Sequence, residues 1–152
     1  MPDLGEFEGA WRLVRVIEDA RAGQTATFEG RAVFNRSGDG LYYAEHGILR
    51  LPGQAPMTAE RRYLWRPAGA GIEVCFEDGR FFHAIASGPR AEAHHDCPPD
   101  RYAVAYDFGG WPAWSCRWRV IGPRKDYAMA SSYARLGACA ADGAGVEETS
   151  TI

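Results

Sequence analysis

The chain has the size of a single domain and no strong excess of charge, with 152 residues, 46% hydrophobic side chains and a formal net charge of −3. A domain of this length buries roughly 70% of its unfolded surface, so it needs neither a metal ion nor a disulfide to fold. A slightly acidic chain without a basic face is not expected to bind nucleic acid. No stretch approaches the ~18 consecutive apolar residues of a membrane span, so no membrane partner is expected either.

The N-terminal residues and the cysteines indicate the compartment. Residues 1–8 are acidic and lack the apolar centre of a secretory signal peptide, which predicts a cytoplasmic protein. The four cysteines, Cys75, Cys97, Cys116 and Cys139, have no paired spacing such as C-x-x-C. In a reducing compartment we therefore expect free thiols.

Turn signals rich in Gly, Pro and Asp recur about every eight to twelve residues, as in all-β sandwiches and barrels. A short helical turn is expected before Trp11, but no segment suits the long helix of a parallel crossover. The chain from Gly137 to residue 152 is small and acidic, which predicts a flexible tail after a domain over residues 1–136. The sequence thus predicts about eight to ten antiparallel strands, over residues 9–18, 25–36, 40–50, 57–67, 71–77, 80–87, 91–96, 102–109, 113–122 and 125–136.

Within these segments apolar side chains alternate with period two. Ile72, Val74 and Phe76 share one face, and similar faces begin at Leu41, Tyr102, Trp114 and Tyr127. The dipeptide Asp78-Gly79 separates two such runs and predicts a hairpin with a type I′ turn, which needs positive φ at both residues. Strict alternation after this turn places His83 on the face opposite Phe82.

Closure of the sheet is the next expectation. Many short strands joined by short turns leave two exposed edges unless the sheet closes on itself. An up-and-down barrel removes those edges, and about eight strands leave room inside for side chains or one small ligand. A sandwich satisfies the same alternation, so the residue pattern by itself leaves both architectures open.

Three short motifs in order favour the barrel. Gly9-Ala10-Trp11 opens the first strand, Lys125-Asp126-Tyr127 stands near the last, and Arg135 follows. Together they resemble the lipocalin and calycin families, in which Gly-x-Trp opens the first strand, Thr-Asp-Tyr comes late, and an Arg packs over the first Trp. The resemblance covers residues 9–135 and implies a calycin-like barrel closed partly by Trp11 and Arg135. It departs at Lys125, where those families have Thr.

Longer segments resemble an uncharacterised calycin-like family, a domain of unknown function. The resemblance implies the fold but no activity, because one fold serves many functions. The segments that carry it are Gly9-Ala10-Trp11, Leu41-Tyr42-Tyr43-Ala44-Glu45, Tyr63-Leu64-Trp65, Asp78-Gly79-Arg80-Phe81-Phe82-His83, residues 95–102 and residues 122–127.

The residues proposed to bind a ligand combine aromatic side chains with a few polar ones. An apolar cavity with convergent polar groups is typical of small-molecule sites. Glu45 stands at an inward position, where a carboxylate is costly unless it is paired. An Arg or His across the barrel would be a structural partner for it, and a ligand would be a functional one. The candidate ligand-binding residues are Tyr43, Glu45, Trp65, His83, His95, Cys97, Asp100, Tyr102, Trp118 and Tyr133.

Other chemistry remains open at the same residues. His83, His95 and Cys97 are zinc-ligand types without a known zinc spacing, so no metal is expected. A small haem-binding barrel would need His83 or His95 as axial ligand, but its further glycines after the first Trp are missing, and no cofactor is expected. An enzyme would pair His95 with Cys97 as base and nucleophile, oriented by Asp100, or use Glu45 or His83 in acid–base catalysis.

The sequence therefore predicts a cytoplasmic binder of a small, mostly apolar molecule with a polar end. The apolar part would lie among the aromatic side chains, and groups such as Glu45, His83, His95 or Tyr102 would hold the polar end. Two alternatives remain, an enzyme that uses the same cavity and an interaction module whose barrel core is full. The oligomeric state and the ligand are not predicted.

Overall fold

The computed structural model describes residues 1–137 and consists of one antiparallel sheet preceded by a short 3-10 helix. Each predicted strand is present with its ends within two residues of the expected ones, and the predicted helical turn is present as η1. No helix among these residues is long and apolar enough to cross a membrane. The elements are η1 (Leu4–Phe7), β1 (Gly9–Asp19), β2 (Gln24–Ser37), β3 (Gly40–Arg50), β4 (Met57–Ala68), β5 (Gly71–Phe76), β6 (Phe81–Ile85), β7 (Arg90–Cys97), β8 (Asp100–Asp107), β9 (Trp114–Gly122) and β10 (Lys125–Arg135).

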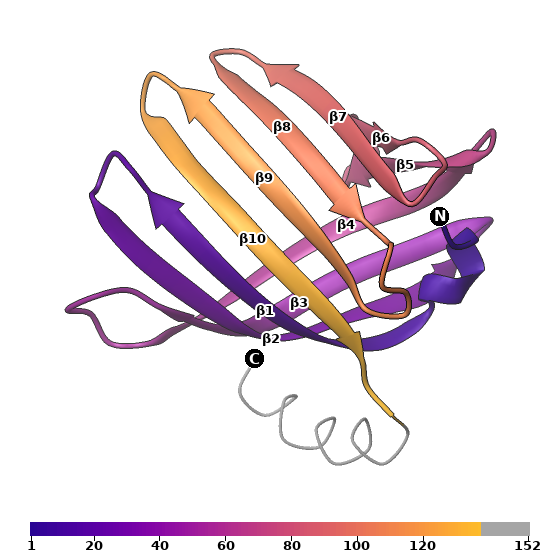
Figure 1. Ribbon diagram of the computed structural model, residues 1–152, viewed down its shortest axis with the longest axis horizontal. Helices are drawn as coiled ribbons and strands as arrows, with labels where there is room; N and C mark the ends of the chain where they lie inside the picture. The colour runs from indigo at the N-terminus through magenta and orange to yellow at the C-terminus, as the bar shows by residue number, and fades with distance from the viewer. Residues whose placement is uncertain (138–152) are drawn as a thin grey trace.

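The ten strands form one meander whose first and last strands pair. The order across the sheet is β6-β5-β4-β3-β2-β1-β10-β9-β8-β7. Figure 1 shows the sheet curling, so that β7 to β10 cross in front of β2 to β5. The antiparallel barrel predicted from the sequence is confirmed. The tail predicted over residues 137–152 lies outside the described residues, apart from Gly137, as does Cys139.

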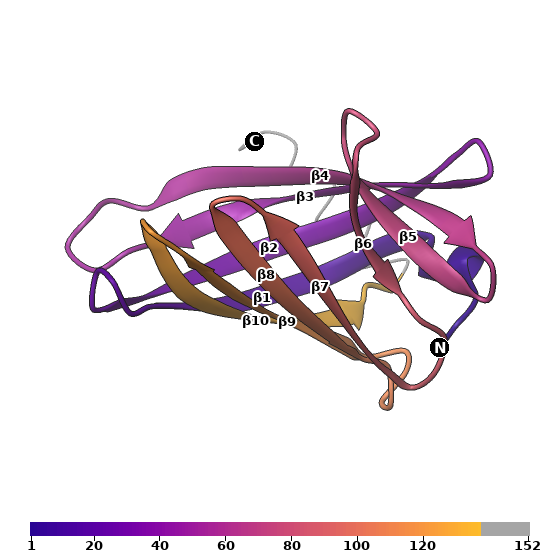
Figure 2. The same ribbon diagram turned by 90° about the horizontal axis from the view of Figure 1, so that it is seen from above.

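Backbone hydrogen bonds do not close the barrel completely, because β6 and β7 are edge strands rather than paired neighbours. Figure 2 shows these two strands meeting near the loop that joins them and diverging away from it. Side chains close the seam instead. His83 Nε2 lies 3.0 Å from the Tyr106 hydroxyl, and the Phe82 and His95 rings are 5.3 Å apart.

Alternation along each strand determines what faces the interior. On β1 the side chains of Trp11, Leu13 and Arg15 are buried, whereas Arg12 and Val14 are exposed. β2 and β3 approach very closely where Gly30 pairs with Gly47. A Cβ atom on Gly30 would lie 2.1 Å from the His46 carbonyl oxygen, so a larger residue would push these strands apart.

Helix η1 closes one end of the barrel, which we call the closed end. The Phe7 ring is fully buried against Trp65, Trp111 and Trp114. The Trp11 indole donates a hydrogen bond of 2.9 Å to the Phe7 carbonyl. The expected cap is confirmed, because the Arg135 guanidinium lies 3.9 Å from the centre of the Trp11 ring.

The β5–β6 hairpin differs from its prediction in two ways. Only Gly79 has positive φ, so the turn is not type I′. Instead the Gly79 N–H donates to the Phe76 carbonyl, and the Phe76 N–H donates to the Arg80 carbonyl. The pairing register also shifts between Val74 and Cys75. Because this irregularity breaks the alternation, Phe82 and His83 are both buried, and the prediction that they lie on opposite faces is wrong.

Candidate functional site

The interior of the barrel, here called the lumen, is lined mainly by aromatic side chains and contains three charged ones. Its free volume is about 30 Å³, which is enough for roughly one water molecule. Its lining residues come from eight of the ten strands and are Arg15, Tyr43, Glu45, Arg61, Tyr63, Trp65, Val74, Phe82, His83, Tyr106, Trp114, Cys116, Trp118, Ser131 and Tyr133.

An ion pair inside the lumen joins Arg15 on β1 to Glu45 on β3 and spans the intervening strand β2. Arg15 Nη1 donates to Glu45 Oε2 at 2.5 Å, and Nη2 donates to Oε1 at 2.9 Å. The Glu45 side chain is 2% exposed. Tyr43 donates a further hydrogen bond to Glu45 Oε1 and lies 2.8 Å from the Tyr133 hydroxyl. Arg15 Nε donates to Ser131, so the pair is held from both sides.

The hydrogen bonds and charges around the Arg15–Glu45 pair shift the pKa values of Glu45 and of the two nearby tyrosines. Burial alone would raise the pKa of Glu45, but the hydrogen bonds and charge of Arg15 outweigh it, so this pKa lies below its usual value. Burial raises the pKa of Tyr43 and of Tyr133, and the nearby Glu45 charge raises both further. Glu45 is therefore ionised and both phenols are neutral at pH 7.

His83 is a second buried polar group of the lumen. Its Nε2 lies 3.0 Å from the Tyr106 hydroxyl, whereas its Nδ1 is buried without a hydrogen-bond partner among the described residues. Burial, together with the nearby His95, lowers the pKa of His83 from 6.5 to about 4. The imidazole is thus neutral at pH 7, and its unpaired nitrogen is a polar group without a structural role.

Arg61, His95, Tyr63, Tyr102 and Trp118 surround the lumen away from η1, and we call them the mouth cluster. All five are partly exposed, unlike Tyr43 and Glu45 beneath them. The Trp118 ring contacts Tyr63, Tyr102 and the Arg61 guanidinium, which lies 5.4 Å from the ring centre. The His95 and Tyr102 rings are 6.1 Å apart.

The structure places the predicted ligand-binding residues in three groups. Six of them line the lumen, namely Tyr43, Glu45, Trp65, His83, Trp118 and Tyr133. His95 and Tyr102 belong to the mouth cluster. Cys97 is exposed at the end of β7, and the Asp100 carboxylate lies 2.9 Å from Lys125 Nζ. Cys97 and Asp100 are thus not brought to the lumen, because they stand at the outer end of the β7–β8 hairpin.

The structure bears on two of the alternatives, an enzyme with a cysteine nucleophile and a metal site. His95 is not hydrogen bonded to Cys97 or Asp100, since its ring packs against Phe82 and Tyr102, and no nucleophile–base pair forms there. Cys116, the thiol inside the lumen, has its pKa raised to about 12 by burial, so it is unreactive at pH 7. Residues 1–137 contain no group of three or more His, Cys, Asp or Glu side chains arranged for a metal ion.

Sequence reasoning missed Arg15 and Arg61, the two cations of the lumen. A signal for both was present. Arg15 continues the inward positions of Trp11 and Leu13 on β1, and Arg61 continues those of Tyr63 and Trp65 on β4. Extending the alternation to charged residues would therefore have identified Arg15 and Arg61 as candidate partners of Glu45.

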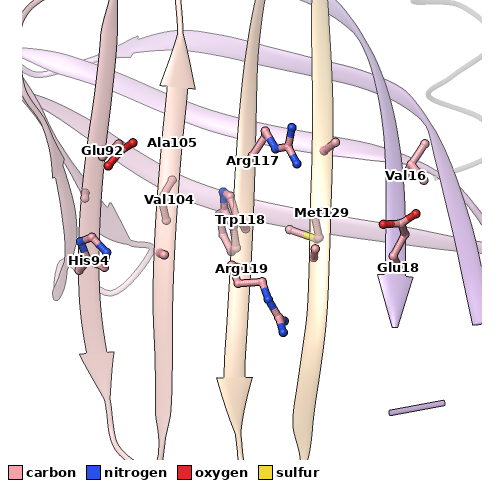
Figure 3. A pocket seen from close by; sticks show the side chains of 14 residues that line it. Val16, Glu18, Glu92, His94, Val104, Ala105, Arg117, Trp118, Arg119 and Met129 are labelled. Atoms are coloured by element: carbon pink, nitrogen blue, oxygen red, sulfur yellow. The ribbon is translucent and has the colours of Figure 1, made fainter. Parts of the chain in front are cut away.

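A larger hollow of about 400 Å³ lies on the outer face of β7 to β10 and β1. Its floor is made of small side chains, including Ala103, Ala105, Ala128 and Ala130. Figure 3 shows Glu92, His94, Arg117, Arg119 and Glu18 around it. These five positions alternate with the buried ones on their strands, so their side chains lie on the outer side of the sheet. Val104, Trp118 and Met129 border the hollow as well, and Trp118 also lines the lumen.

Comparisons with known proteins agree with this architecture. The chain is similar to the S-type phycobiliprotein lyase CPES from Guillardia theta, with a TM-score of 0.62 and 8% identity over 89% of this chain and 91% of that one. At this identity the likeness concerns the fold alone. No curated protein matches the sequence. A profile described as a family of unknown function, DUF6314, matches residues 7–135, and the chain belongs to that family.

Proposed function

We propose that the chain binds a small organic molecule in the barrel, with its polar end inside the lumen and its apolar body among the aromatic rings of the mouth cluster. The observation that carries this is the convergence of polar groups on one aromatic space. The Arg15–Glu45 pair, Tyr43, and the unpaired Nδ1 of His83 all belong to the lumen.

A purely structural core does not require this arrangement. Replacing a buried ion pair by well-packed apolar side chains is often neutral or stabilising. Arg15 and Glu45 therefore add little to stability that Leu or Met would not provide. Retaining them inside an aromatic lumen is consistent with the recognition of a polar group.

The size of the lumen sets how a ligand enters. A free volume of about 30 Å³ admits no organic molecule while every side chain stays in place. The mouth side chain Tyr63 is only partly buried, so it can swing outward at lower cost than Tyr43 or Trp65. The proposed ligand takes the place that the Tyr63 side chain now occupies, while Arg61 and Trp118 stay beside it.

The test is native mass spectrometry of the protein purified gently from its host, compared with its mass after denaturation. The proposal expects a bound species that is lost in Trp118→Ala, whose ring borders both the lumen and the outer hollow, and kept in Ala105→Asp, which alters only the outer hollow. A species lost in Ala105→Asp, whatever Trp118→Ala does, places the ligand outside and contradicts the proposal.

The second candidate function is an interaction module with a full core. The observation that favours it is the contrast between the small lumen and the outer hollow of about 400 Å³. Exposed Val16 at that hollow adds apolar surface. This candidate expects an apo mass in the same experiment, together with no small-molecule stabilisation in a thermal-shift screen.

A further inference from the structure

We infer that the ligand of the lumen carries an anionic group, such as a carboxylate, a sulfonate or a phosphate, and that Arg61 binds this group. The inference rests on the proposed function and specifies the chemical class of the molecule. It comes from the charge inside the barrel and from the partners of each charged side chain.

The lumen has one positive charge in excess. Among its lining residues, Arg15 and Arg61 are cationic and Glu45 is anionic, while His83 is neutral at pH 7. Arginine remains protonated in proteins, so neither cation can lose its charge. The three charges therefore sum to one uncompensated cation inside an aromatic enclosure.

Arg61 is the cation that lacks an ion-pair partner of its own, although the Glu45 charge is near enough to interact with it. Both oxygens of Glu45 are taken by Arg15, and Tyr43 also donates to one of them. Within residues 1–137, Arg61 forms no ion pair. Its contacts include the Trp118 ring, the neighbouring Tyr63 side chain and a weak one of 3.9 Å from Nη2 to the Met129 sulfur.

This environment suits an anionic ligand. The Trp118 ring attracts the guanidinium that lies over it, and the partly buried site strengthens any hydrogen bond that the guanidinium donates. A guanidinium presents two parallel N–H groups that match a carboxylate or phosphate. A neutral polar group would leave the excess charge uncompensated.

The neighbouring Arg62 provides a matched control. It lies on the outer side of the same strand and pairs with Glu60, with 3.1 Å between Nη2 and Oε1. Replacing either arginine by Gln removes one positive charge from the same strand. Only the Arg61→Gln change removes it from the lumen.

The experiment compares two fluorescent probes with the same aromatic skeleton, anilinonaphthalene sulfonate and its neutral counterpart phenylnaphthylamine, by titration against the folded protein. We expect the sulfonate to bind the wild type about tenfold more tightly than the amine. Arg61→Gln should remove this preference by weakening sulfonate binding about tenfold relative to amine binding, while Arg62→Gln should keep it. Circular dichroism and the melting temperature establish that each variant is folded.

Three results would overturn the inference. If the wild type binds both probes equally tightly and Arg61→Gln changes neither affinity, the lumen does not distinguish an anionic ligand from a neutral one. If Arg117→Gln removes sulfonate binding and Arg61→Gln does not, the sulfonate binds in the outer hollow. If neither probe binds, the proposed function fails, and the inference fails with it.

Discussion

The two ends of the barrel each contain an arginine against a tryptophan, but the two pairs differ in their remaining contacts. At the closed end, Arg135 lies 3.9 Å from the Trp11 ring and donates to the carbonyls of Glu6 and Glu8. At the mouth, Arg61 lies 5.4 Å from the Trp118 ring and forms no ion pair within the described chain. The first pair completes a core, whereas the second leaves charge available for a ligand.

The largest expected effect tests the closed end. Trp11→Ala removes a fully buried indole that packs beneath Arg135, so it should destabilise the fold by about 3–5 kcal/mol. Trp118→Ala at the partly exposed mouth should cost no more than about 2 kcal/mol. Urea unfolding of both variants measures the difference. Equal losses would mean that the mouth is ordinary core, and a loss below about 1 kcal/mol for Trp11→Ala would contradict its role as a cap.

The next effect tests whether the lumen ion pair is structural. Glu45→Gln leaves the buried Arg15 without its counter-charge and should cost about 3–5 kcal/mol. The double variant Arg15→Met with Glu45→Leu removes both charges and should recover most of that loss. Chemical denaturation of the single and double variants gives the coupling free energy. A double variant as unstable as the single one would show that the pair itself holds the barrel together.

Sequence patterns predicted the strands because alternation and turn residues are local signals. Residues 9–18 and 125–136 were expected as strands and are observed as β1 and β10. The same alternation predicted the inward faces that contain Tyr43 and Tyr133. It failed at His83, because a bulge depends on how two strands pair, and neither strand encodes that by itself.

The candidate site was predictable only in part. Six of its proposed residues line the lumen because they stand at inward positions. Cys97 and Asp100 were chosen for their chemical type, but they stand at the end of the β7–β8 hairpin and do not line the lumen. The free volume of the lumen depends on the rotamers of many side chains from different strands, and no spacing in the sequence reports it.

The smallest effect concerns pH and separates the lumen from the surface. His83 titrates near pH 4 when folded and near 6.5 when unfolded, because burial, together with the nearby His95, disfavours its charged form. Between these values the unfolded chain binds more protons, so stability present above pH 6.5 is lost as the pH falls towards 4. The loss from this group should reach at most about 3 kcal/mol. Measuring the free energy of unfolding from pH 7 to 4 for the wild type, His83→Gln and the exposed control His94→Gln isolates it. If the free energy of unfolding of His83→Gln depends on pH in the same way as that of the wild type, the His83 imidazole is in contact with water. The floor of the lumen would then be hydrated.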